Sequence, residues 1–448
     1  MDISQNADCV FYRNPSKQYP KAVRGEGIYV FDSKGKRYID GSGGAVVVSI
    51  GHGVSEICDA IAEQASRISF AHGSQFTNEP AEKLAVKLAS AAPEGLDRVY
   101  FLSGGSEAVE TAVKMARQYQ VDRGIPSKYK VISRWTAYHG NTLGALALSG
   151  HKARRRYYKP LIQQTPHITP AYCYRCAFGL EPDTCSLECA DELEKAIAGE
   201  GPETVSAFIA EPVVGATAGV VIPPNGYFER IRSICDTHDV LFIADEVMTG
   251  IGRTGRFFGI DHWNAAPDII VSGKGLASGY APLCCVIAHT KIHDTIKKGN
   301  GTFVHGHTYS QNPVSAAAGL AVLDYIENHD LISRCAENGR YLLESLKKLF
   351  SHHIVGDIRG LGLFAGIEFV SDRNSREPFS PDHRLNTVIG QKSLQKGLIC
   401  YPGSGGADGG RGDHILLAPP FITTRDDIDA ITDILDEAFA ETIREKNV

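Results

Sequence analysis

A lysine between two glycines follows an apolar run that has the composition of a buried strand. The stretch reads DIIVSGKGLASGY, from Asp268 to Tyr280, and the lysine is Lys274. It is not the lysine of a nucleotide P-loop, because the glycine spacing of that motif is missing before it. Burial at the end of an apolar strand removes water from a lysine side chain, which disfavours its ammonium form and lowers its pKa. Lys274 is therefore predicted to act as a nucleophile toward an aldehyde.

Polar segments follow other apolar runs as well. The turn SGGSE precedes a helical pattern, so its free backbone N–H groups offer an anion site at the positive end of a helix. AYHGNT carries Tyr138 and His139, and an aromatic residue there is either packed in the core or stacked on a planar ring. IADEV ends an apolar run with Asp245 and Glu246, and without a metal-ligand cluster nearby we favour hydrogen bonding to a ligand. Taken singly, each segment is more often an ordinary turn or helix cap.

Six short apolar runs, separated by helical patterns, must position these segments. Near-continuous apolar strands that alternate with helices predict a mostly parallel sheet covered on both faces. Such sheets bind ligands at the carboxyl ends of their strands, so the polar segments are expected to converge on one rim. The runs are Arg98–Leu102, Tyr129–Ser133, Val205–Ala210, Val240–Ala244, Asp268–Ser272 and Leu283–Ala288.

Together these features suit one cofactor. Pyridoxal 5'-phosphate (PLP) has a phosphate for the glycine turn, a flat ring for the aromatic face, a ring nitrogen for the strand-end acid and an aldehyde for the lysine. A lysine Schiff base with an acidic partner for the ring nitrogen is the binding pattern of this cofactor. The sequence therefore predicts a PLP site at the rim.

The composition is that of a soluble globular protein. The 448 residues carry a formal net charge of -6, which argues against nucleic acid or an anionic membrane as a partner. No apolar run approaches the roughly 18 to 20 residues that span a bilayer, and the N-terminus lacks the pattern of a signal peptide. The 11 cysteines, an odd number spread along the chain, indicate free thiols in a reducing compartment. We therefore expect a cytoplasmic protein.

The pattern changes in the last third of the chain. Helical segments, strand-like runs around a glycine-rich bend and a long final helix predict a smaller α+β domain over residues 331–448. The stretch GEGIYVFDSKGKRYID reads as a hairpin that completes this domain, so residues 1–60 are assigned to it. Residues 61–330 are then the large PLP-binding domain. A glycine-rich loop at Gly403–Gly412 is expected to face the cleft.

The motifs and their order resemble the class III (ω-amino acid type) PLP-dependent aminotransferases of fold type I. The resemblance covers nearly the whole chain, and its most specific part is IADEV and GIGRTG followed by SGKG. It implies an α/β fold with a mostly parallel central sheet covered by helices and a smaller α+β domain. It also implies that Lys274 forms a Schiff base with the cofactor and moves the substrate proton, while Asp245 keeps the ring nitrogen protonated.

The resemblance assigns further residues to the cofactor. It implies that Val247 and Tyr138 lie on opposite faces of the ring, and that the glycine and serine of SGGSE hold the phosphate. Thr308, in HTYSQNP, matches a residue that reaches the phosphate of the neighbouring subunit, which implies a homodimer or a dimer of dimers with shared active sites. For Glu211 a purely structural hydrogen bond is an open alternative. Beside Lys274 and Asp245, the implied set is Gly105, Ser106, Tyr138, His139, Glu211, Val247 and Thr308.

The chain departs from its relatives in the substrate region. Met248 stands where several members carry a glutamine that binds the ring oxygen. Ala216 and Leu416 stand where ornithine- and GABA-type members carry the glutamate and arginine of a substrate switch, which argues against those activities. Arg411, in GGRGDH, is the candidate for binding a substrate carboxylate, with a surface arginine as the alternative. Val46 is expected to line a roomier donor pocket.

The expected reaction transfers an amino group from an amine or ω-amino acid to an α-keto acid, with pyruvate preferred over 2-oxoglutarate. The expected partners are therefore small molecules, an amine donor and a keto-acid acceptor. A PLP-dependent racemase, epimerase or aminomutase, or a dialkylglycine-type decarboxylase, are alternatives on the same fold.

Four cysteines lie in a segment that the resemblance does not explain. CYRCAFGLEPDTCSLEC contains Cys173, Cys176, Cys185 and Cys189, a C-x2-C pair followed by a C-x3-C pair. Two such pairs can supply four thiolates to a structural zinc ion, although the distance between them is shorter than in usual zinc modules. We favour a loop of free thiols, with zinc as the alternative.

Overall fold

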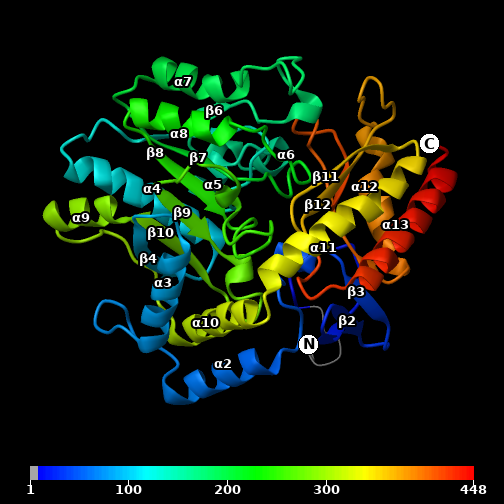
Figure 1. The fold of residues 1–448 in the computed structure, drawn as a ribbon, viewed down its shortest axis with the longest axis horizontal. Coiled ribbons are helices and arrows are strands. Elements are labelled where there is room, and N and C mark those ends of the chain that lie inside the picture. The colour runs from blue at the N-terminus through cyan, green and yellow to red at the C-terminus, as the bar shows by residue number, and fades with distance from the viewer. Residues whose placement is uncertain (1–8) are drawn as a thin grey trace.

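A seven-stranded sheet forms the centre of the larger lobe in the computed structural model, which describes residues 9–448 (Figure 1). From edge to edge its strands are β4 (Leu96–Leu102), β10 (Cys284–His289), β9 (Ile269–Ser272), β8 (Leu241–Glu246), β7 (Val205–Ala210), β5 (Lys130–Arg134) and β6 (His167–Ile168). Strands β5 to β9 pair in parallel, whereas β10 runs antiparallel to both β4 and β9. The predicted mostly parallel sheet is confirmed.

Helices cover both faces of this sheet because alternate apolar side chains of each strand point to opposite sides. Helix α4 (Gly105–Asp122) packs on one face, where Ile243 and Val271 belong to the same apolar cluster as its own side chains. Helices α7 (Glu188–Glu200) and α8 (Tyr227–Thr237) lie on the other face. There Phe228 stacks on Phe242, with their ring centroids 5.7 Å apart. This double cover explains why β7, β8 and β9 are buried along their whole length.

Two four-stranded sheets and three helices form the smaller lobe (Figure 1). One sheet has the order β1 (Ala22–Glu26), β2 (Tyr29–Asp32), β3 (Arg37–Asp40) and β13 (Leu398–Ile399), and the other β11 (Val355–Gly360), β12 (Ala365–Phe369), β15 (His414–Leu417) and β14 (Tyr401–Gly403). The helices are α11 (Leu331–Leu346), α12 (Leu385–Gln395) and α13 (Arg425–Lys446). Strand β3 pairs in parallel with β13, so these N-terminal strands belong to the smaller lobe, and the division into residues 1–60, 61–330 and 331–448 stays a proposal. Residues 1–8 of this division lie outside the described part of the chain.

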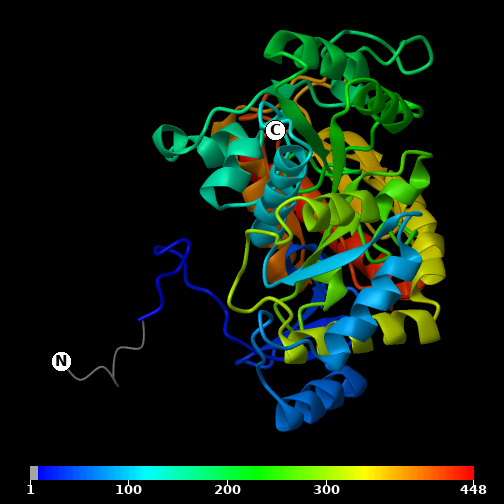
Figure 2. The same cartoon turned by 90° about the vertical axis from the view of Figure 1, so that its left-hand side faces the viewer.

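The remaining helices join or flank the two lobes. Residues 9–21 leave the body of the molecule as an exposed segment (Figure 2). Over residues 9–448, none of the helices combines the length and the apolar character that crossing a bilayer requires. The helices that join or flank the lobes are α1 (Gly43–Val46), α2 (Ser55–Arg67), α3 (Glu79–Ala91), α5 (Leu143–Leu148), α6 (Lys152–Arg155), α9 (Thr290–Lys298) and α10 (Pro313–Asn328).

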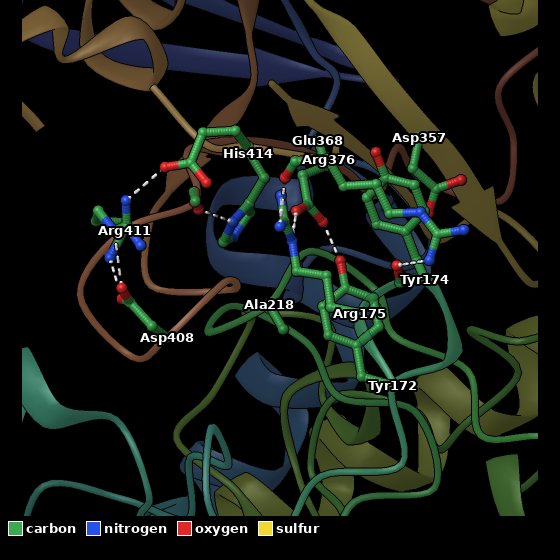
Figure 3. A network of polar contacts seen from close by, with 12 residues as sticks. Tyr172, Tyr174, Arg175, Ala218, Asp357, Glu368, Arg376, Asp408, Arg411 and His414 are labelled. Atoms are coloured by element: carbon green, nitrogen blue, oxygen red, sulfur yellow. Dashed lines mark hydrogen bonds and ion pairs between the residues drawn. The ribbon is translucent and has the colours of Figure 1, made fainter. Parts of the chain in front are cut away.

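A buried polar network fastens the segment around Tyr172 to the hairpin of β11 and β12 (Figure 3). The carboxylate of Glu368 accepts a hydrogen bond from Tyr172 Oη and another from Arg175 Nε at 2.6 Å. It also lies 2.9 Å from Arg359 Nη2. Burial alone would raise the pKa of Glu368, but the two guanidinium groups hold it below its ordinary value. Glu368 is therefore an ionised acceptor shared by both lobes.

The contact between Gly339 in α11 and Gly362 gives a prediction about stability. A Cβ on Gly339 would lie 2.2 Å from the backbone carbon of Gly362. Because backbone must move to make room, we expect Gly339→Ala to lower the free energy of unfolding by about 1–3 kcal/mol. Gly199→Ala in α7 is the matched control, since a Cβ there meets nothing within 4 Å. Equal melting temperatures of the two variants would contradict the prediction.

Candidate active site

A cavity of about 230 Å³ lies at the carboxyl ends of the parallel strands. Its walls come from the end of β8 and the segments after β5, β7, β8 and β9, together with the first turn of α4 and the first residue of β10. All residues that the sequence assigns to the cofactor, except Thr308, are in this wall. The lining residues are Gly105, Ser106, Tyr138, His139, Gly140, Glu211, Asp245, Val247, Met248, Lys274 and Cys284.

Lys274 follows β9 and has a left-handed backbone, with a φ of 46°. A non-glycine residue in this region is strained, and its surroundings must hold it there. A Cβ on Gly273 would lie 2.4 Å from Cys284 Sγ, and a Cβ on Gly275 would lie 2.8 Å from Ser49 Oγ, so both flanking glycines are needed for close packing. Burial lowers the pKa of Lys274, while the carboxylate of Asp245 partly opposes this. The site therefore favours a neutral amine more than water does.

The carboxylate of Asp245 is buried and points to His139. His139 Nδ1 lies 2.7 Å from Asp245 Oδ2, and the Val247 N–H donates to Asp245 Oδ1 at 3.1 Å. The Ser149 hydroxyl accepts a hydrogen bond from the His139 backbone N–H at 2.8 Å, which holds the backbone of this residue in place. Nε2 of His139 is buried and has no hydrogen-bond partner among the described residues. A carboxylate in this position can accept a hydrogen bond from one further proton-bearing group.

Glu211 follows β7 and lies close to this pair. Burial raises the pKa of Glu211 to about 7; His139 opposes the rise, the charge of Asp245 adds to it, and Arg134 opposes it. Glu211 Oε2 is buried and unpartnered among the described residues. Its side chain can therefore carry a proton near neutral pH and donate it in a hydrogen bond.

The first turn of α4 is open toward the cavity. Gly104 is its N-cap and provides no side-chain hydrogen bond, so the first N–H groups of the helix are free for an anion. A Cβ on Gly105 would lie 3.2 Å from a methyl of Val247, which shows how closely the turn approaches the end of β8. Ser106 Oγ accepts the Asn141 N–H at 2.9 Å and thereby joins this turn to the segment after β5.

These groups fit PLP. The open helix end suits its phosphate, Asp245 its protonated ring nitrogen, and the amine of Lys274 its aldehyde. Tyr138 and Val247 both line the cavity and offer faces for the ring. The buried, unpartnered atoms of His139 and Glu211 are further sites for polar groups of a bound molecule.

Three residues of the sequence prediction do not line this cavity. Thr308 is exposed. Val46 is only 2% exposed and packs in an apolar cluster with Phe364 and Leu416. The side chain of Arg411 is 44% exposed. Its guanidinium forms ion pairs with Asp408 at 2.8 Å and Glu377 at 2.7 Å (Figure 3).

Cys284 and Arg154 are neighbours of the site that the sequence reading missed. Cys284 reaches the rim because β10 is antiparallel, so the start of this strand lies beside the ends of its neighbours. Burial raises the pKa of Cys284 to about 12, against the opposing influence of Lys274. The guanidinium of Arg154 lies 4.5 Å from the ring centroid of Tyr138. The only sequence signal for Arg154 is the basic run KARRR, which is also typical of a solvated surface.

The four cysteines of the segment 173–189 line one small hollow. Burial raises the pKa of Cys189 to about 12, and Cys173, Cys185 and Cys176 raise it further, which indicates that the four thiols are neighbours. Within residues 9–448, however, no three His, Cys, Asp or Glu side chains are placed to hold a metal ion. The zinc alternative stays a prediction, and metal analysis of the purified protein decides it.

The family model and the similar proteins all identify the same family. The family model "Aminotransferase class-III" matches residues 11–439. The chain is 44% identical to the uncharacterized aminotransferase YodT of Bacillus subtilis, over 97% of each chain. It is 39% identical to the diaminobutyrate–2-oxoglutarate transaminase of Halomonas elongata, covering 91% of this chain and 87% of that protein. It is 35% identical to the putrescine–pyruvate aminotransferase of Pseudomonas aeruginosa, covering 94% and 90%.

The fold agrees with these relatives. The crystal structure of a thermostable (S)-enantioselective ω-transaminase from Thermomicrobium roseum matches with a TM-score of 0.89 and 37% identity. The match covers 97% of this chain and 96% of that chain. Sequence, fold and cavity therefore place this chain in the class III aminotransferases, PLP-dependent enzymes of fold type I.

Proposed function

We propose that the enzyme transfers an amino group from an amine or ω-amino acid to an α-keto acid. The observation that carries this proposal is the amine of Lys274 in the same cavity as the buried carboxylate of Asp245. When bound there, PLP supplies a ring that takes up electrons from the substrate carbon. The residues around it must then hold the cofactor, exclude water and move one proton.

Each residue has a role in this proposal. Lys274 would hold the cofactor through its aldehyde and would carry the proton of the substrate carbon, for which its lowered pKa is suited. Asp245 holds the proton on the ring nitrogen, and His139 orients Asp245 through their 2.7 Å hydrogen bond. Tyr138 and Val247 enclose the ring, while Gly105 and Ser106 hold the phosphate at the start of α4.

The assembly and the location are also part of the proposal. Thr308 is exposed, as a residue must be if it completes the phosphate site of a neighbouring subunit. This supports a homodimer or a dimer of dimers. The cysteines of residues 9–448 form no disulfide, which supports the cytoplasm as the compartment.

The acceptor is proposed to be pyruvate, with 2-oxoglutarate as the alternative. Two relatives whose names give the acceptor differ in it, with 2-oxoglutarate in one name and pyruvate in the other. Similarity alone therefore does not decide between them. The preference for pyruvate rests on Ala216 and Leu416, which replace the substrate switch expected in ornithine- and GABA-type enzymes.

Lys274→Ala tests the reaction. We expect at least about a 10²-fold loss of turnover, because the variant loses both the nucleophile and the proton carrier. Lys298→Ala is the matched control, since Lys298 is exposed at the end of α9. Full turnover by Lys274→Ala would contradict the proposed mechanism.

The absorbance of the wild-type holoenzyme separates the reaction types. For a transaminase, donor alone converts the cofactor to its amino form, and a keto acid is needed to restore it. An isomerase would turn over without an acceptor, and a decarboxylase would release carbon dioxide. Either result would exclude the proposed transamination.

Glu211 gives a prediction about pH. Its pKa rises from 4.5 to about 7 in the folded protein, so between these values the folded state keeps a proton that the unfolded state has lost. The stability of the wild type therefore falls as the pH rises through this window. In protein freed of PLP, we expect the melting temperature of Glu211→Gln to fall less between about pH 5 and pH 7 than the melting temperature of the wild type. Glu246, whose pKa is also about 7, is present in both proteins and contributes equally to their pH dependence. Parallel curves of melting temperature against pH for the two proteins would therefore contradict the prediction.

A further inference from the structure

Helix α6 lies between the cavity and the glycine loop Gly403–Gly412. His151 Nε2 lies 3.0 Å from the Ser404 carbonyl oxygen, and Lys152 Nζ donates to the Asp408 carbonyl oxygen at 2.8 Å. On the cavity side, the guanidinium of Arg154 lies over the ring of Tyr138. The helix thus holds the loop at one end and presents an arginine to a wall of the cavity at the other.

Arg154 differs from its neighbour on the same helix. Arg155 Nη1 donates to the carbonyl oxygens of Ala147 and Ser149, both at 2.8 Å. Arg154 is half-buried, yet its guanidinium makes no ion pair or hydrogen bond with any residue from 9 to 448. Its nitrogens are also not among the unpartnered atoms that are shielded from solvent. Arg154 therefore combines a fixed position over an aromatic ring with open N–H donors.

Arg411, the sequence candidate for carboxylate recognition, has the opposite character. Its Nε and Nη1 atoms are occupied by Asp408 and Glu377. To bind a substrate it must first give up two ion pairs. A carboxylate that approaches Arg154 breaks no ion pair with the residues from 9 to 448.

We propose that Arg154 binds the carboxylate of the keto-acid acceptor at the mouth of the cavity. The inference rests on the proposed transamination and names the residue that gives it acceptor specificity. A guanidinium binds a carboxylate through two parallel hydrogen bonds, and the contact with the ring of Tyr138 restricts the position of this guanidinium. The charge of Arg154 also contributes to the lowered pKa of Lys274, after larger effects of burial and other groups, which shows that the two side chains are within electrostatic reach.

The test compares a keto acid with an aldehyde that has no carboxylate. Enzyme in the amino form of the cofactor is mixed with pyruvate or with propionaldehyde, and the return of the cofactor absorbance is followed. For Arg154→Gln we expect the second-order rate constant with pyruvate to fall about 10- to 100-fold, the range of a charge-assisted hydrogen-bonded pair. The rate constant with propionaldehyde should stay within about twofold of the wild type, because no carboxylate is bound.

Two further variants sharpen the comparison. Arg154→Lys keeps the charge but loses the planar fork, so it should recover part of the rate with pyruvate. Arg156→Gln is the matched control, since Arg156 follows the same helix and is exposed. It should behave as the wild type with both acceptors.

Three results would overturn the inference. Equal losses with pyruvate and propionaldehyde, together with weaker PLP binding, would mean that Arg154 only supports Tyr138. Unchanged rates with pyruvate would mean that Arg154 has no part in recognition. A pyruvate-specific loss in Arg411→Gln but not in Arg154→Gln would assign the role to Arg411. Failure of the proposed function is distinguishable, because the wild type itself would then not transfer an amino group to either acceptor.

Discussion

The buried carboxylate of Asp245 influences the protonation of the groups around it. An ionised carboxylate is costly in a protein interior unless hydrogen bonds and charges compensate it. Here His139 and the Val247 backbone N–H supply two hydrogen bonds. Burial is the main cause that raises the pKa of Glu211 to about 7 and lowers the pKa of Lys274; the charge of Asp245 adds to the first shift and partly opposes the second. One negative charge thus favours a proton on the groups around it.

The cavity around that charge is also supported by contacts between the lobes. The larger lobe supplies the strand ends of the cavity, and its segment around Tyr172 is tied to β12 through Glu368. The backbone oxygen of Ala218, in the segment after β7, accepts a hydrogen bond from Arg359, which also pairs with Glu368. This segment begins at Glu211, which lines the cavity. The network of Arg359 and Glu368 in the smaller lobe therefore supports the wall that contains Glu211.

Much of the site could be predicted because strand ends and polar turns are encoded locally. The apolar runs specify a buried parallel sheet, and the parallel geometry brings Tyr138, Glu211, Asp245 and Lys274 together without further information. An apolar run does not encode the direction of its strand, so the sequence could not predict that Cys284 lines the cavity. Ion pairs between distant residues are equally hidden, as the pairing of Arg411 with Glu377 shows. A basic run such as KARRR does not reveal which arginine faces an aromatic ring.

Because strand β10 is antiparallel, some residues of the site are close in sequence, whereas others are far apart. Lys274 and Cys284 lie at the two ends of a short connection between adjacent strands, so their contact forms by local folding. Tyr138 and Glu211 reach the rim only when β5 and β7, which are far apart in the sequence, have paired. Non-local pairings of this kind form slowly, because a long loop must close first. A cofactor that needs the whole rim therefore binds only the completed sheet, and by mass action it stabilises the finished fold over every partly folded form.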